Sequence, residues 1–183
     1  MDPLARAAVT AAELRATMAH LAGGVVLVTS TLDGEDVGMT ATAFCSVSLD
    51  PPLVLVSVGE GSRMYDALAT CESWAVSILP AGARQVATRF AIKGRPSDRL
   101  LLADLAWHRG PVTGHVVLDE GIASVECLTE QRTLAGDHAV VIGRVVGVHS
   151  RNPTARPLVH FRSRYRTLAS SSTGPPDPAD DEG

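Results

Sequence analysis

The chain has 183 residues, of which 45% are hydrophobic, and its mean hydropathy is +0.14. This is enough apolar material for a buried core, so a mainly disordered chain is excluded. Sixteen Lys and Arg residues stand against twenty Asp and Glu residues, which gives a formal net charge of −4. Because this balance disfavours a polyanionic partner, we expect the protein to bind no nucleic acid.

The cysteines and histidines show no metal-binding pattern. Cys45, Cys71 and Cys127 form no CxxC pair, and three is an odd number, which argues against a disulfide framework or a zinc ribbon. No two His or Cys residues stand at metal-ligand spacing, so we expect no metal site.

The start of the chain does not resemble a targeting segment. Residues 1–24 lack the basic start and the apolar run of a signal peptide. No apolar stretch approaches the roughly 20 residues that span a bilayer. We therefore expect a cytoplasmic protein with no membrane partner.

The first elements are predicted by capping and turn residues. Thr10 and Glu13 form a capping box, which predicts an amphipathic helix over residues 11–21 that Gly23 and Gly24 end. Its apolar face is formed by Leu14, Met18 and Leu21. Residues 25–31 and 37–49 are predicted to form a β-hairpin, because the Asp33-Gly34 pair tolerates the positive φ angles of a tight turn.

The rest of the chain alternates short helices with apolar strands. Residues 53–58 and 74–79 are predicted strands, Ser62 caps a helix that places Met64, Leu68 and Cys71 toward the core, and 82–90 is a further helix. Residues 93–97 are predicted to form a loop. Later strands are predicted near 116–118, 123–131, 139–150, 158–161 and 165–168.

Hairpins separated by a few helices do not give the regular alternation of a doubly wound sheet. We predict a mainly β domain with short α-helices over residues 1–168, arranged as a closed or half-closed β-barrel that hides the edges of its apolar strands. Residues 169–183 are rich in Ser, Pro, Gly and acids, so we expect a disordered acidic tail.

One short segment invites comparison with a nucleotide-binding loop. Gly59-Glu60-Gly61-Ser62 lies between a strand and a helix, but Met64 occupies the place of a third glycine, so a Rossmann fold is disfavoured. The helix start can still hold a phosphate through free N–H groups at residues 62–64 and the Arg63 guanidinium. The alternative is that Ser62 only caps the helix and Arg63 is solvated.

Two further places are candidates for ligand contact. Residues 38–52 alternate small hydroxyl residues with apolar ones, which suits a flat ligand lying close to the backbone and equally suits a strand with one wet face. His138 follows Gly136-Asp137 at the start of an apolar strand, where it lies either at the mouth of a barrel or simply at a strand end.

Several of these segments together, in this order and at these intervals, resemble the flavin reductase family of flavin-binding split barrels. The likeness covers residues 14–168 and is greatest for the small reductase components of two-component flavin monooxygenases. The segments that carry it are Ala22–Thr29, Gly38–Ala41 with Phe44, Ser46–Val56, Trp74–Leu79, Glu126-Cys127 and Gly136-Asp137-His138.

The resemblance implies a homodimeric split β-barrel that binds FAD or FMN, and it implies which residues do so. Two positions, His138 and Tyr165, match residues near the nicotinamide. The implied flavin contacts are Met39, Thr40, Ala41, Thr42, Ala43, Phe44, Ser46, Val47, Ser48, Ser57, Ser62, Arg63, Arg89, Phe90, Lys93 and Arg99.

The resemblance also implies an activity, in which NADH or NADPH reduces the flavin and the free reduced flavin goes to a partner monooxygenase of aromatic or natural-product metabolism. Hydride transfer from nicotinamide to flavin needs no side-chain acid or base, so none is assigned. Two alternatives remain: a flavin-binding protein without enzymatic activity, and a split-barrel oxidoreductase that acts on its own organic substrate.

Overall fold

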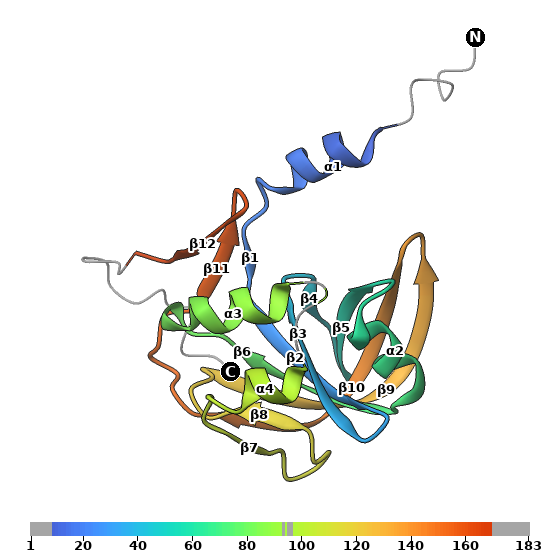
Figure 1. Ribbon diagram of the computed structural model, residues 1–183, viewed down its shortest axis with the longest axis vertical. Helices are drawn as coiled ribbons and strands as arrows, with labels where there is room; N and C mark the ends of the chain where they lie inside the picture. Colours follow the sequence, from blue (N-terminus) through green and yellow to red (C-terminus); the bar gives the residue numbers. More distant parts are fainter. Residues whose placement is uncertain (1–8, 93, 95–96, 170–183) are drawn as a thin grey trace.

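The computed structural model describes residues 9–92, 94 and 97–169, and it is mainly β with short helices, as predicted (Figure 1). The expected acidic tail lies, apart from residue 169, outside the described residues. The helical elements are α1 (Ala11–Met18), α2 (Arg63–Thr70), the 3-10 turn η2 (Ala81–Ala83), α3 (Arg84–Ala91) and α4 (Asp98–Leu102).

The main sheet has seven antiparallel strands in the order β3-β2-β6-β9-β10-β5-β4. No hydrogen-bonded pairing joins the outer strands β3 and β4 among the described residues, so the main sheet is not closed by backbone pairing there. Its strands are β2 (Val26–Leu32), β3 (Glu35–Ala41), β4 (Phe44–Leu49), β5 (Pro52–Gly59), β6 (Ser73–Ile78), β9 (Ala123–Ala135) and β10 (His138–Ser150).

The predicted hairpin around Asp33-Gly34 is confirmed. Strands β2 and β3 pair in register from Val26 with Ala41 to Leu32 with Glu35. Asp33 and Gly34 have φ angles of 52° and 79°, the backbone conformation that a tight two-residue turn requires.

The single strand predicted over residues 37–49 is wrong. The chain bends at Thr42-Ala43, so β3 stays paired with β2 while β4 leaves to pair with β5. Across this bend, which we call the β3–β4 corner, the Ser57 N–H donates to the Ala43 carbonyl at 3.0 Å. The sequence of residues 37–49 gave no local signal that the strand changes its pairing partner at the bend, because the residues on both sides of the bend form regular strand.

Two hydrophobic clusters form the core. One packs the inner face of the main sheet against α2 through Met64, Ala67 and Leu68. The other packs α3 and α4 against the opposite face through residues such as Phe90 and Leu102. The apolar spacing of both predicted helices is therefore confirmed, although Cys71 caps the end of α2 and is only half-buried.

Smaller sheets flank the main one. β1 (Gly23–Gly24), β11 (Leu158–Phe161) and β12 (Arg164–Thr167) form one, while β7 (Trp107–Arg109) and β8 (Val116–Leu118) form a hairpin. The sequence did not predict α4 or β7. It also ended the strand from 123 too early, because β9 and β10 continue to the turn at Gly136-Asp137.

Helix α1 extends away from the sheets (Figure 1). Its capping box forms as predicted, with the Glu13 N–H donating to Thr10 Oγ1 at 3.2 Å. The predicted apolar face of this helix is not buried, because Leu14, Met18 and Leu21 are 50 to 66% exposed. Within one chain, this face has no covering surface among the described residues. None of the described helices has the length and apolar character needed to cross a membrane.

Candidate functional site

A cavity of about 660 Å³ opens at the β3–β4 corner. It lies where the end of β3, the end of β5, the start of α2, the end of α3 and the β9–β10 turn meet. The lining residues are Met39, Thr40, Ala41, Thr42, Ala43, Ser57, Gly59, Glu60, Gly61, Ser62, Phe90, Ala91, Asp137 and His138.

The long wall of the cavity is formed by β3 and the corner, residues 39–43. Their side chains are mostly small, so a flat group can approach the backbone closely. Thr40 Oγ1 donates to the Ala87 carbonyl at 2.8 Å, which fixes α3 against this wall. Gly38 lies beneath it, where a Cβ would stand 2.8 Å from the Phe90 ring, so glycine is needed for this close approach.

The start of α2 forms a second wall. Ser62 Oγ accepts from the Tyr65 N–H at 3.1 Å, which confirms the predicted cap. The Ser62 N–H is not free as expected, because it donates to the Gly59 carbonyl at 3.3 Å. The Arg63 side chain, 44% exposed, donates to the fully buried Asp98 carboxylate at 3.2 Å. Arg63 is therefore neither solvated alone nor a lining residue of the cavity.

His138 stands at the mouth of the cavity rather than only at a strand end. Its Nδ1 lies 2.7 Å from Asp137 Oδ1. Its Nε2 lies 3.3 Å from the place that a Cβ on Gly59 would occupy, because His138 and Gly59 are partners in the β5–β10 register. Because residue 59 is a glycine and carries no side chain, the His138 imidazole has room beside the cavity.

The structure brings together only part of the predicted flavin set. Residues 39–43, Ser57, Ser62 and Phe90 line the cavity with His138. Phe44 packs on the core from the adjoining strand β4, which also carries Ser46, Val47 and Ser48.

The remaining predicted residues lie elsewhere within one chain. Arg89 forms a 3.9 Å ion pair with Asp104, and Arg99 is exposed on α4. Tyr165 packs against the second hydrophobic cluster, and burial raises the pKa of its phenol. Lys93 lies outside the described residues.

Three residues of this region were missed by sequence reasoning. Ala91 and Asp137 line the cavity, and Asp98 forms an ion pair with Arg63. Asp137 had a local signal, since it is the residue between a turn glycine and His138. Asp98 had no such local signal, because a carboxylate near an Arg-rich loop is expected at the surface. Its burial is evident only from the fold.

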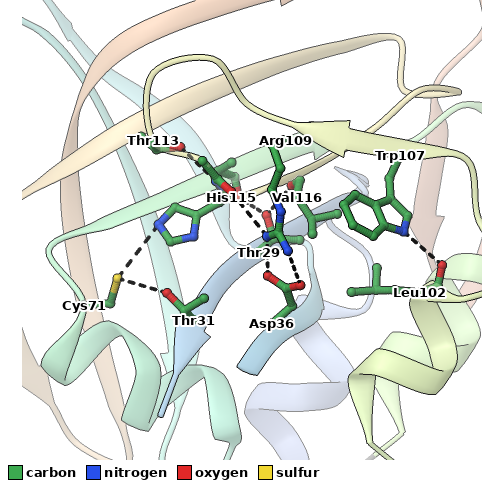
Figure 2. Close-up of polar contacts among 12 residues, drawn as sticks. Thr29, Thr31, Asp36, Cys71, Leu102, Trp107, Arg109, Thr113, His115 and Val116 are labelled. Atoms are coloured by element: carbon green, nitrogen blue, oxygen red, sulfur yellow. Dashed lines mark hydrogen bonds and ion pairs between the residues drawn. The ribbon is translucent and has the colours of Figure 1, made fainter. Parts of the chain in front are cut away.

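A separate polar cluster lies at the β2–β3 and β7–β8 hairpins and contributes nothing to the lining of the cavity (Figure 2). Arg109 donates to both Asp36 carboxylate oxygens, at 2.6 and 2.8 Å. Thr29 Oγ1 donates to the Val116 carbonyl at 2.6 Å. These contacts join the two hairpins, so we assign this cluster a structural role.

The comparisons with known proteins identify the family. Residues 18–169 match the model of the flavin reductase like domain. The chain is 37% identical over 156 residues to the NADH-dependent FMN reductase AsuE2 of Streptomyces nodosus subsp. asukaensis, covering 85% of this chain and 84% of that protein. It is 36% identical over 151 residues to the reductase component of 4-hydroxyphenylacetate 3-monooxygenase from Thermus thermophilus, covering 82% and 92%.

A solved structure supports the same assignment. The NADH:FAD oxidoreductase SgcE6 of Streptomyces globisporus, in complex with NAD and FAD fragments, superposes with a TM-score of 0.81 at 31% identity. The likeness covers 94% of this chain and 98% of that one. With the family model spanning nearly the whole described region, this chain belongs to the flavin reductase like domain family.

Proposed function

We propose that the protein is an NADH-dependent flavin reductase that supplies free reduced flavin to a partner monooxygenase. The observation that carries this proposal is the open cavity at the β3–β4 corner, with His138 at its mouth, in a chain whose relatives reduce FMN or FAD with NADH. The reductase component from Thermus thermophilus is the basis for the monooxygenase partner.

The cavity residues fit a flavin. Small side chains at 41–43 leave the backbone of the corner accessible to a flat ring, and the Phe90 ring beneath Gly38 gives the wall an apolar base. The bound flavin would supply the electron acceptor, which takes hydride from the nicotinamide. The chain itself then has to hold two rings in contact and exclude water from between them. That task needs no acid or base, and an open cavity lets the product leave.

The finer assignments follow from the same family. We propose FMN or FAD as the flavin, NADH or NADPH as the reductant, and a split β-barrel completed around the β3–β4 corner. The free thiols Cys45, Cys71 and Cys127 support a reducing compartment, so we propose the cytoplasm. Arg63, Arg89, Lys93 and Arg99 remain our proposed phosphate contacts, with Tyr165 proposed for the nicotinamide.

We further propose that the active form is a homodimer. The apolar face of α1 and the exposed Val47 and Leu49 of β4 are surfaces that a second copy would cover. Light scattering is expected to give twice the chain mass of 19.1 kDa. A monomer of 19.1 kDa that reduces flavin at the full rate would refute the proposed dimer.

The His138→Ala variant is expected to raise the Michaelis constant for NADH and to slow flavin reduction, while flavin affinity changes little. The imidazole at the cavity mouth can donate to the nicotinamide nucleotide and keep its ring over the flavin, a role in orientation. His138→Asn keeps a donor and should recover part of the loss. Stopped-flow reduction at saturating NADH checks this, and a rate and NADH dependence equal to wild type would remove His138 from the site.

The proposed activity is tested by steady-state oxidation of NADH and of NADPH with FMN, FAD and riboflavin compared side by side. Turnover that depends on added flavin is the expected result. If NADH is not oxidised with any of the three flavins, the proposed function is wrong.

A further inference from the structure

Beside the contacts that join the two hairpins, Figure 2 also shows Thr31 and His115 next to Cys71, the half-buried residue that caps the end of α2. Thr31 Oγ1 of β2 lies 3.6 Å from Cys71 Sγ, and Ser73 Oγ of β6 lies 4.0 Å from it. His115 Nε2, from the residue before β8, lies 3.9 Å from the same sulfur. Three other segments of the chain therefore direct polar atoms at one thiol. We call these four residues the Cys71 cluster.

The His115 side chain is suited to proton exchange with this thiol. It is 4% exposed, and its ring points toward Cys71 (Figure 2). Its Nε2 also lies 2.8 Å from Ser73 Oγ, whereas its Nδ1 is buried and has no hydrogen-bond partner among the described residues. Because no partner holds Nδ1, the ring is not fixed in one tautomer, so Nε2 can accept the thiol proton or donate to the thiolate. Burial lowers the pKa of His115, which keeps the imidazole neutral at pH 7.

The surroundings of Cys71 also favour its ionised form. Burial raises the pKa of the Cys71 thiol, but hydrogen bonds from the Ser30 hydroxyl, the Ser73 backbone and the Thr31 hydroxyl lower it by more, so it lies below the ordinary value of 9.0. The thiolate, and not the thiol, is the nucleophilic form of cysteine. The Cys71 cluster thus has the chemistry of a reactive thiol.

A hollow of about 510 Å³, formed by the end of α2 with β9 and β10, gives access to this thiol from solvent. Its lining includes Cys71 and four charged residues whose formal charges cancel, namely Arg132, Arg144, Glu72 and Glu130. The hollow shares no lining residue with the flavin cavity, and it includes no residue of α1 or β4, the elements that we assign to the dimer contact. A small uncharged reactant can therefore reach Cys71 without entering the flavin cavity.

We propose that Cys71 is a site of oxidation by hydrogen peroxide, which converts its thiol to a sulfenic acid. The source of the peroxide rests on the proposed function, because dioxygen takes two electrons and two protons from free reduced flavin and becomes hydrogen peroxide. Oxidation of Cys71 would thus increase with the share of reduced flavin that dioxygen consumes before the partner monooxygenase does.

The reaction at Cys71 is a two-electron oxidation of sulfur. The thiolate attacks one peroxide oxygen, so an S–O bond forms as the O–O bond breaks. The sulfur loses two electrons and the peroxide gains them. The departing hydroxide combines with the proton released by the thiol, which His115 Nε2 is placed to accept, and gives water.

The experiment treats the full-length protein with hydrogen peroxide and dimedone, a reagent that traps sulfenic acids, and follows the Cys71 peptide by mass spectrometry. We expect Cys71 to be labelled severalfold faster in the folded protein than in the protein unfolded in urea, which lacks the cluster. Cys127 is buried, and burial raises the pKa of its thiol to about 12, so folding should protect it. Labelling of Cys71 that is equal or slower in the folded protein would overturn the proposal.

Two threonine variants separate the cluster from the hollow. Thr31→Val keeps the shape of the side chain and removes a hydroxyl beside the sulfur. Thr70→Val is the matched control, because the Thr70 hydroxyl bonds to the Asp66 and Ala67 carbonyls although Thr70 lines the same hollow. We expect Thr31→Val and His115→Asn to slow labelling severalfold and Thr70→Val to leave it unchanged. Rates equal to wild type in both Thr31→Val and His115→Asn would show that the cluster does not activate the thiol.

The source of the peroxide is tested during turnover with NADH, FMN and dioxygen, with and without catalase. Labelling of Cys71 that catalase prevents is the expected result. NADH oxidation without labelling of Cys71 would overturn the proposed source. Failure of the proposed function is distinguishable, because NADH would then not be oxidised, whereas added hydrogen peroxide would still label Cys71.

Discussion

Glu126→Ala is expected to lower the free energy of unfolding by about 3 to 5 kcal/mol, because it removes a buried carboxylate that accepts several hydrogen bonds. Glu126 has no exposed surface. Its Oε2 accepts from the Thr113 N–H at 2.6 Å and from Thr113 Oγ1 at 2.7 Å, while its Oε1 lies 2.9 Å from His149 Nε2. Truncation leaves these groups without an acceptor. Urea unfolding, followed by the fluorescence of the buried Trp74, measures the loss.

The same carboxylate gives a dependence on pH. Burial raises the pKa of Glu126, but hydrogen bonds from Thr113, His149 and Val112 lower it by more, so it lies below the ordinary value of 4.5. The ionised form therefore stabilises the folded state fully above pH 4.5, and this stabilisation is lost as the pH falls below that value.

Glu126→Gln provides the control for both effects. It keeps the size of the side chain and one carbonyl acceptor, but it cannot titrate. We expect an intermediate stability at neutral pH and a smaller loss of stability on acidification than in wild type. Identical loss of unfolding free energy on acidification in the two proteins would show that Glu126 is not the group that titrates.

Phe90→Ala is expected to lower the free energy of unfolding by about 3 to 5 kcal/mol as well, and to weaken flavin binding at the same time. The Phe90 ring is fully buried, belongs to the second hydrophobic cluster and forms part of the cavity lining. Its loss leaves a void beneath Gly38, so the wall of residues 39–43 loses its support.

Val86→Ala separates the two consequences. Val86 packs against the same cluster from the same helix α3, but it does not line the cavity. It should cost less stability and leave flavin affinity unchanged, whereas Phe90→Ala should weaken FMN severalfold at a temperature where the protein is still folded. Equal flavin affinity in Phe90→Ala and wild type would remove Phe90 from the site.

Local chemistry predicted those elements whose signals are contained in a few neighbouring residues. The Thr10-Glu13 capping box, the Asp33-Gly34 turn and the Ser62 cap each form as predicted, because each is decided by hydrogen bonds and φ angles within one turn. The mainly β class followed from the spacing of these signals along the chain.

What the sequence missed depends on partners far away in the chain. The bend at Thr42-Ala43 exists because β4 finds β5 as a partner, and nothing in residues 37–49 specifies that exchange. Asp98 is buried beneath Arg63, 35 positions away. The apolar face of α1, which includes Leu14 and Met18, has no covering surface among the described residues of one chain. In each case the environment of the residue depends on the tertiary fold or on a second copy of the chain, and not on its neighbours in the sequence.

The candidate site was predicted mainly through family resemblance. Local reasoning pointed to residues 38–52, to the start of α2 and to His138 but could not join them, since they come from different strands. The resemblance joined them, and the cavity unites residues 39–43, Ser57, Ser62 and Phe90 with His138. Tyr165 and Arg99, which the resemblance also implied, do not line the cavity within one chain.

The most direct test of the central claim is anaerobic mixing of the protein with FMN or FAD and an excess of NADH, with the flavin absorbance followed in time. A flavin reductase bleaches the oxidised flavin absorbance in a phase whose rate saturates with NADH, and it turns over many flavins per chain. Flavin that binds to the protein but keeps its oxidised absorbance in the presence of NADH would contradict the account and would identify a flavin-binding protein without reductase activity.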